Sequence, residues 1–298
     1  MLKVPVNSPP SSPIEKESFS SDVEHVKGYR GIKAIGCTPA DELIAKVGLH
    51  CFNSHKGTNL QFLTVTQLFL RTVSHVSYTM TLDAFDPANH SIHSIDTGVW
   101  DASHRNGENL RLITTYCIPT GSDESCPQWD PNGVDVLYTG LMPKWLDDDA
   151  LTGSDKLHFY EVCCLAMNFF LTYFLLFDHL LNTQNTEHLV PLMFKMFQTQ
   201  VNDSDLQENA WLHLYAQVAA YSRWNVYMVD HLPLEIKKVV VQTKEDIESS
   251  LKLKSSNAIF YLSFKTRGGA EYRSIIRQTR DGRPQHMCLE VKNVEMDK

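Results

Sequence analysis

Few side chains in this sequence combine the residue types and the spacing that chemistry requires. His90 and His93 could share a metal ion, but no third ligand follows nearby, which favours a solvated hairpin. Cys163 and Cys164 lie in an apolar run, where a thiol usually acts as a small buried hydrophobic group. The chain has no Gly-x-Gly-x-x-Gly, phosphate-loop, Gly-x-Ser-x-Gly or His-Glu-x-x-His pattern. The sequence therefore predicts a protein that is not an enzyme and needs neither cofactor nor metal.

A group of basic residues near the end of the chain is a stronger candidate for a binding site. Arg273 and Arg277 lie four residues apart in a segment with strand character, so both side chains should leave one face of a sheet and reach solvent. Four further cations flank this segment: Lys265, Arg267, Arg280 and Arg283. Two interpretations stay open, a docking surface for an anionic partner and the ordinary solvated face of a one-sided sheet.

The charge distribution separates this region from the rest of the chain. The 298 residues include 27 Lys and Arg against 35 Asp and Glu, which gives a formal net charge of -8. From residue 252 onward ten basic and five acidic residues give +5, so the preceding residues carry -13. A chain with this net charge is a poor general binder of nucleic acid, and we therefore expect protein partners.

Cysteine usage and the first residues indicate an intracellular protein. The seven cysteines are odd in number and form no Cys-x-x-Cys pair, which favours reduced thiols. The first residues lack the apolar core of a secretory signal, and their Ser/Pro-rich composition is typical of a disordered tail. We expect a tail and short lead-in over residues 1–37, and a nuclear or, alternatively, a cytoplasmic location.

Residues 38–118 have the pattern of one long helix followed by four antiparallel strands. Thr38 as a capping hydroxyl and Pro39 at the first helical position predict the helix start, and the helix should end near Gly57. Strands are expected at 59–70, 76–85, 91–100 and 110–118. The alternation of apolar and polar residues is clearest in the second strand, where it places Leu82 on the inner face.

Residues 202–298 repeat this order of elements. A helix is predicted from the capping box at Ser204 and Gln207 to about Tyr221. Strands are expected at 234–243, 257–266, 271–279 and 286–294, with glycine-containing hairpin turns between the last three. The predicted fold class is α+β, with two units that each pack a long helix on a four-stranded antiparallel sheet and have their own core.

Residues 119–201 read as a connection that contains a long apolar run. Residues 162–181 are long enough to span a membrane, but Asp178 and the lack of a flanking Lys/Arg cluster argue against a membrane anchor. Two other interpretations stay open: a buried or partner-facing helix, and an insertion over about 163–201 that a shorter form of the protein lacks.

Several segments resemble plant cystatins. The runs ELIAKVGLHCFN at 42–53 and GTNLQF at 57–62 resemble the helix and first long strand of that family, and YTMTLDAFD at 78–86 resembles its next strand. Residues 40–161 and 202–292 are more closely similar to a crucifer family of cystatin-related proteins of unknown function, which includes male-sterility proteins of early meiosis. This resemblance implies two cystatin-like units, a nuclear interaction or scaffold role in male fertility and homologous chromosome pairing, and partners associated with meiotic chromosomes.

Cystatins inhibit papain-like proteases with an N-terminal glycine, a Gln-x-Val-x-Gly hairpin and a Pro-Trp hairpin. At the position of the first hairpin this chain has Arg71, Val73 and His75, which keep only the valine of that pattern. His75 adds a side chain where glycine lets the backbone approach a protease closely. The resemblance therefore implies a degenerate inhibitory hairpin, and protease inhibition is the alternative function.

Overall fold

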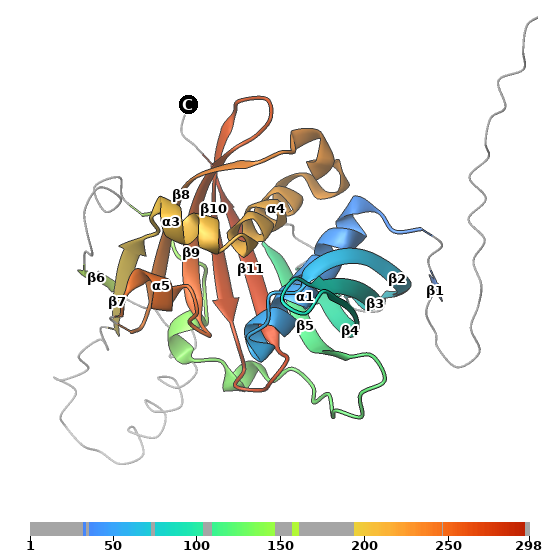
Figure 1. Cartoon of the computed structure of the whole chain (residues 1–298). Coiled ribbons are helices and arrows are strands. Elements are labelled where there is room, and N and C mark those ends of the chain that lie inside the picture. The colour runs from blue at the N-terminus through green and yellow to red at the C-terminus, as the bar shows by residue number, and fades with distance from the viewer. Residues whose placement is uncertain are drawn as a thin grey trace, which may run out of the picture.

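A single antiparallel sheet dominates the structure, a computed structural model that describes residues 32–33, 36–72, 75–103, 109–146, 157–160, 194–245 and 247–295. The sheet has eleven strands in the order β1-β2-β3-β4-β5-β11-β10-β9-β8-β7-β6 (Figure 1). Their bounds are β1 Ile32–Lys33, β2 Gln61–Thr72, β3 Val76–Asp86, β4 Ser91–Asp101, β5 Leu110–Pro119, β6 Leu157–Tyr160, β7 Phe194–Gln200, β8 Glu235–Thr243, β9 Ala258–Lys265, β10 Glu271–Thr279 and β11 Met287–Val294. The eight strands expected from the sequence are all present, and the 271–279 strand has its predicted bounds.

The first predicted helix is confirmed as α1 (Pro39–Lys56). Thr38 caps it: the hydroxyl accepts from the Asp41 N–H, and the Asp41 carboxylate accepts from the Thr38 N–H, at 3.2 and 2.9 Å. Gly57 ends the helix in the left-handed conformation with φ 67°, which glycine adopts without steric cost.

The second predicted helix is divided. A short helix, α3 (Asp203–Glu208), is capped by Asn202, and the helix that enters the core, α4, spans Trp211–Trp224. Ser204 and Gln207 of the expected capping box thus lie inside α3, and the capping residue is Asn202. The buried side of α4 carries Leu212, Tyr215, Ala216, Val218, Ala219, Ala220 and Tyr221.

The two halves form one sheet and share one core, which corrects the expectation of two units with separate cores. The last strand of each half pairs with the other, β5 with β11, from Leu110–Val291 to Thr114–Met287. Helices α1 and α4 lie side by side on the same face of the sheet (Figure 1). Their buried residues belong to one cluster that includes Leu43, Leu82, Ala216 and Phe260. Because β5 pairs with β11, the sheet continues without an edge where the two halves meet.

The opposite face of β8–β10 is covered by the connection that follows β5, which we call the strap (residues 120–146). It contains two short 3₁₀ turns, η1 (Pro131–Gly133) and η2 (Val136–Tyr138). Tyr138, Met142 and Leu146 pack there against strand residues such as Tyr261 and Ile275. This sheet is therefore covered on both faces where the basic residues of β10 lie.

The predicted register of β3 is confirmed, because Met80, Leu82 and Ala84 are all buried. The predicted insertion over about 163–201 includes β7, which pairs with β8, and Val201, which lies in the core. The rest of that segment, including the 162–181 run, lies outside the described residues. Among the described helices none is both long and apolar enough to cross a membrane.

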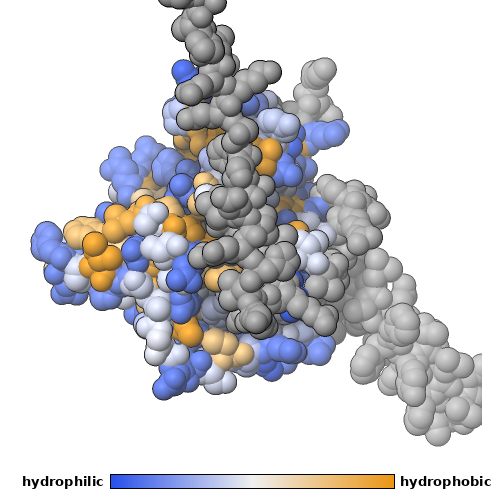
Figure 2. Space-filling model, turned by 90° about the vertical axis from the view of Figure 1, so that its right-hand side faces the viewer, coloured by the Kyte–Doolittle hydropathy of each residue, from blue (hydrophilic) through white to orange (hydrophobic). Residues whose placement is uncertain are grey.

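Strand β2 lies near one edge of the sheet. Strand β1 pairs with it only at Leu70 and Phe69, and two register shifts interrupt the pairing of β2 with β3, one between Phe62 and Thr64 and one between Val65 and Gln67. Figure 2, which faces this side, shows hydrophobic residues in separate areas among hydrophilic ones. Bulges of this kind bend an edge and disfavour the addition of another strand.

Candidate functional site

Two of the residues predicted at the degenerate inhibitory hairpin, Arg71 and His75, lie near the end of β2 and directly before β3. Arg71 is exposed near the end of β2, and Val73 lies outside the described residues. The His75 ring contacts the Trp100 ring of β4, with centroids 4.7 Å apart. This contact brings His75 against Trp100, near the end of β4.

Arg277 is not a surface residue, which corrects the expectation that it reaches solvent. Its exposed fraction is 5 %. The guanidinium donates to the backbone carbonyls of Thr139, Gly140 and Leu141 at 3.4, 2.9 and 3.4 Å, and its Nη2 lies 2.6 Å from a carboxylate oxygen of Glu290. Arg277 therefore fastens the strap to the sheet and is not available for docking.

The other five cations do not form one surface. Arg273 lies on the same side of β10 as Arg277, and its Cζ stands 5.3 Å from the Trp145 ring centroid. Lys265 and Arg267 lie at the β9–β10 turn, whereas Arg280 and Arg283 follow the other end of β10. A nine-residue strand separates these two ends by about 30 Å.

Arg280 and Arg283 bind other parts of the fold. Arg280 donates to the Ser54 hydroxyl at 2.8 Å, near the carboxyl end of α1, where a cation also interacts favourably with the helix dipole. Arg283 donates to the Gln128 carbonyl of the strap and lies 3.4 Å from Asp130. Their contacts therefore hold the β10–β11 turn against its neighbours.

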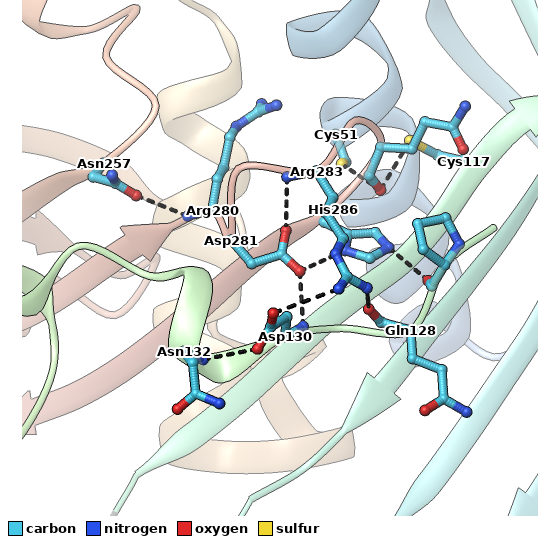
Figure 3. Close-up of polar contacts among 12 residues, drawn as sticks. Cys51, Cys117, Gln128, Asp130, Asn132, Asn257, Arg280, Asp281, Arg283 and His286 are labelled. Carbon is cyan, nitrogen blue, oxygen red and sulfur yellow. Dashed lines mark hydrogen bonds and ion pairs between the residues drawn. The ribbon is translucent and has the colours of Figure 1, made fainter. Parts of the chain in front are cut away.

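A buried acid–base pair in the β10–β11 turn was not predicted from the sequence. The Nδ1 of His286 lies 2.8 Å from Asp281 Oδ2, and both side chains are fully enclosed, with exposed fractions of 0 % (Figure 3). The other ring nitrogen, Nε2, lies 3.0 Å from the Pro127 carbonyl oxygen. A carbonyl only accepts, so the ring donates to Pro127 from Nε2.

The same carboxylate holds the strap. Asp281 accepts from the Asp130 N–H at 2.8 Å and from the Arg283 N–H at 3.1 Å (Figure 3). In a hydrolytic triad the second imidazole nitrogen faces the nucleophile, whereas here it faces a backbone carbonyl and no solvent. In this arrangement the pair cannot act as a general base. A polar turn is usually exposed, so no sequence signal distinguished this one from a solvated turn.

A second polar cluster connects α1, α4 and β10. The Tyr215 hydroxyl donates to Gln278 Oε1 and lies 3.3 Å from His50 Nε2. Burial, together with the nearby Arg280 cation, lowers the pKa of His50 to about 3. Burial also raises the pKa of Tyr215 above its usual range. Both groups are therefore neutral at physiological pH and join the two halves of the core.

Cysteines and histidines provide no metal centre in the described part of the chain. No group of three or more His, Cys, Asp or Glu side chains is placed to hold an ion there. His93 Nε2 instead lies 3.0 Å from the Ser91 hydroxyl. Cys51 and Cys117 both donate to the Gln285 carbonyl, at 3.3 and 3.6 Å, and the cysteines described are free thiols. Cys163 and Cys164 lie outside the described residues.

The described residues thus define a protein of mixed α-helices and β-strands with one large antiparallel sheet, whose buried polar clusters hold its parts together. A family profile described as Protein MS5 matches residues 194–289. UPF0725 protein At2g20620 of Arabidopsis thaliana is 56% identical over 306 residues, which cover 99% of this chain and 93% of the relative. A second Arabidopsis relative, UPF0725 protein At4g29550, is 34% identical over 95% of this chain and 73% of its own length.

The crystal structure of MS5 from Brassica napus has the same fold, with a TM-score of 0.57 and 23% identity over 87% of this chain and 100% of that chain. The chain therefore belongs to the plant MS5 family of UPF0725 proteins.

Proposed function

We propose that this protein is a non-enzymatic interaction protein of plant male fertility, which acts in the nucleus during early meiotic prophase and homologous chromosome pairing. Its partners in this proposal are proteins associated with meiotic chromosomes. Membership of the MS5 family supports the plant and male-fertility setting. The finer assignment rests on the resemblance to male-sterility proteins of early meiosis.

The observation that carries a role without catalysis is the enclosure of the Asp281–His286 pair. Both side chains have exposed fractions of 0 %, and the imidazole Nε2 is directed at the Pro127 carbonyl. A general base must come within hydrogen-bond reach of a substrate proton. The pair instead joins the strap to the sheet, which is what a rigid binding surface needs.

The proposal is tested in the plant. Loss of this chain, together with its close relatives, should reduce viable pollen and impair pairing of homologous chromosomes, and the intact chain should restore both. A tagged form should lie in the nuclei of male meiocytes. Normal pollen and normal pairing in the plants that lack these proteins would contradict the proposal.

Protease inhibition is the second candidate, and the His75–Trp100 contact supports it. The contact places His75, which directly precedes β3, beside Trp100 at the end of β4, so these two segments of the chain lie next to one another. Papain inhibition should be measured for the intact chain and for His75→Gly, which removes the side chain that replaces glycine. Submicromolar inhibition by the intact chain would make protease inhibition the preferred function. Inhibition by His75→Gly but not by the intact chain would show that the side chain of His75 prevents inhibition.

A further inference from the structure

Arg280 carries a positive charge that no described carboxylate neutralises. Its half-buried guanidinium donates through Nη2 to the Ser54 hydroxyl at 2.8 Å, while its Nε is buried without a hydrogen-bond partner among the described residues. In the same part of the chain no Asp or Glu lies within ion-pair distance of it. The side chain also extends away from the neighbouring Asp281 carboxylate (Figure 3). Arg280 therefore lacks the anionic partner that a cation removed from water usually has.

The surroundings of Arg280 do not supply that anion. Burial, together with the Lys56 and Arg280 cations, lowers the pKa of His55, so both charges lie near its ring. Glu124 opposes this effect, but it lies 3.3 Å from the Lys56 ammonium, and the two charges of that pair cancel. Residues 43–82, which include most of α1 and all of β2, contain no Asp or Glu. The carboxyl end of α1 therefore keeps the uncompensated charge of Arg280.

We propose that Ser54 is phosphorylated and that Arg280 binds the resulting phosphate. A protein kinase transfers the γ-phosphoryl group of ATP to Ser54 Oγ: the new O–P bond forms, the bond between the γ-phosphorus and ADP breaks, and the hydroxyl proton passes to a base of the kinase. The phosphate carries about −1.5 to −2 charges at pH 7 and three acceptor oxygens. Since Oγ already contacts the guanidinium, these oxygens come within reach of Nη2 and of the unpaired Nε.

The dipole of α1 opposes a phosphate at this position. Ser54 lies in the last turn of α1, where the free carbonyls act as about half a negative charge. The guanidinium carries a full positive charge in direct contact with the modified oxygen, and an Arg–phosphate pair is among the strongest hydrogen-bonded pairs. Arg280 therefore decides the sign: the phosphate stabilises the fold when Arg280 is present and destabilises it when Arg280 is absent.

Ser54 is placed where a kinase can reach it. The residue is exposed and lies two positions before the end of α1 at Lys56. Helix ends open at a lower free energy than the core of a fold. Opening of the last turn therefore presents the Ser54 hydroxyl without unfolding the rest of α1.

The first test is mass spectrometry of the full-length chain, purified with phosphatase inhibitors from the plant tissues in which it accumulates. Trypsin cleaves after Lys46 and Lys56 and releases VGLHCFNSHK (47–56), in which Ser54 has the only hydroxyl group. A phosphate on this peptide therefore lies on Ser54, and part of the peptide should carry it. Recovery of the peptide in unmodified form alone, from all of these tissues, would overturn the proposal.

The second test measures the effect of Arg280 on the phosphate. The full-length chain with phosphoserine incorporated at position 54 should have an unfolding midpoint roughly 2–6 °C above that of the unmodified chain. In the Arg280→Gln background the same phosphoserine should lower the midpoint. The matched control is Arg267→Gln, an exposed arginine at the other end of β10, which should leave the increase unchanged. Equal shifts with and without Arg280 would overturn the proposal.

A phosphorus NMR titration keeps the test decisive if Arg280→Gln does not fold. The second pKa of phosphoserine is about 6 in a solvated peptide. In the folded chain with Arg280 it should be lower, because a nearby cation favours the dianion. The same pKa in the folded chain and in the free 47–56 phosphopeptide would show that no cation holds the phosphate.

Inorganic phosphate distinguishes a covalent modification from a bound free anion. Millimolar inorganic phosphate should leave the unfolding midpoint of the unmodified full-length chain unchanged. An increase that disappears in Arg280→Gln, together with an unmodified 47–56 peptide from the plant, would assign the position to a free anion and overturn the modification. The inference does not depend on the proposed function, so its failure leaves the role in male fertility untouched.

Discussion

Replacing Arg277 by methionine should destabilise the whole protein, because this substitution removes the cation that joins the strap to β10. The guanidinium is 5 % exposed and contacts three strap carbonyls and the Glu290 carboxylate. Methionine fills much of the same space but leaves all four acceptors without their donor. Removing one partner of a buried pair costs about 3–5 kcal/mol.

This cost can be measured by thermal and urea unfolding. At roughly 2–4 °C per kcal/mol, the Arg277→Met midpoint should fall by roughly 6–20 °C. Protease cleavage within 139–141 should also become faster, since the strap loses its attachment. The control is Arg267→Met, an exposed residue of the same type, which should change stability by less than about 0.5 kcal/mol.

The partner variant Glu290→Gln gives a second check, because a double-mutant cycle with Arg277→Met measures their coupling. If the free energy of unfolding of Arg277→Met lies within about 0.5 kcal/mol of the wild-type value, Arg277 does not hold the strap and the reasoning is refuted.

Three further outcomes are expected. Leu82→Asp should cost at least about 4 kcal/mol because Leu82 is 0% exposed, whereas Thr79→Asp on the other face of β3 should be mild; equal unfolding midpoints would show that the inner face is misassigned. Gly48→Ala should cost about 1–3 kcal/mol in urea unfolding, since the added methyl would overlap the Thr97 side chain; an unchanged midpoint would mean that the helix can move away. The pKa of His50 is about 3 in the folded state, below its value in the unfolded state, so the unfolded state binds the proton first as the pH falls. The free energy of unfolding should therefore decrease below about pH 6.5, by up to about 1.4 kcal/mol per pH unit. The variant His50→Gln should remove that part of the pH dependence, and identical pH profiles would contradict the assignment.

The candidate site was less predictable than the fold. Spacing alone placed Arg273 and Arg277 on one side of β10, and this is confirmed, since both contact the strap. It could not show that the strap covers that side, because the strap residues lie more than a hundred positions earlier in the chain. The Asp281–His286 pair was missed for the same reason: its burial depends on Pro127 and Asp130.

Local sequence determined the elements of this protein. Thr38, Pro39 and Gly57 specify the ends of α1 through hydrogen bonds and backbone angles within a few residues. The alternation in β3 specifies which side chains face the core, because successive side chains of a strand point to opposite faces. Only the tertiary structure decided how the elements are joined. The pairing of β5 with β11 merges two repeated patterns into one sheet, and contacts between distant segments convert Arg277 from an expected surface charge into a buried one. Hydrophobic periodicity specifies that a face is covered but not which segment covers it, because burial of apolar area has no direction.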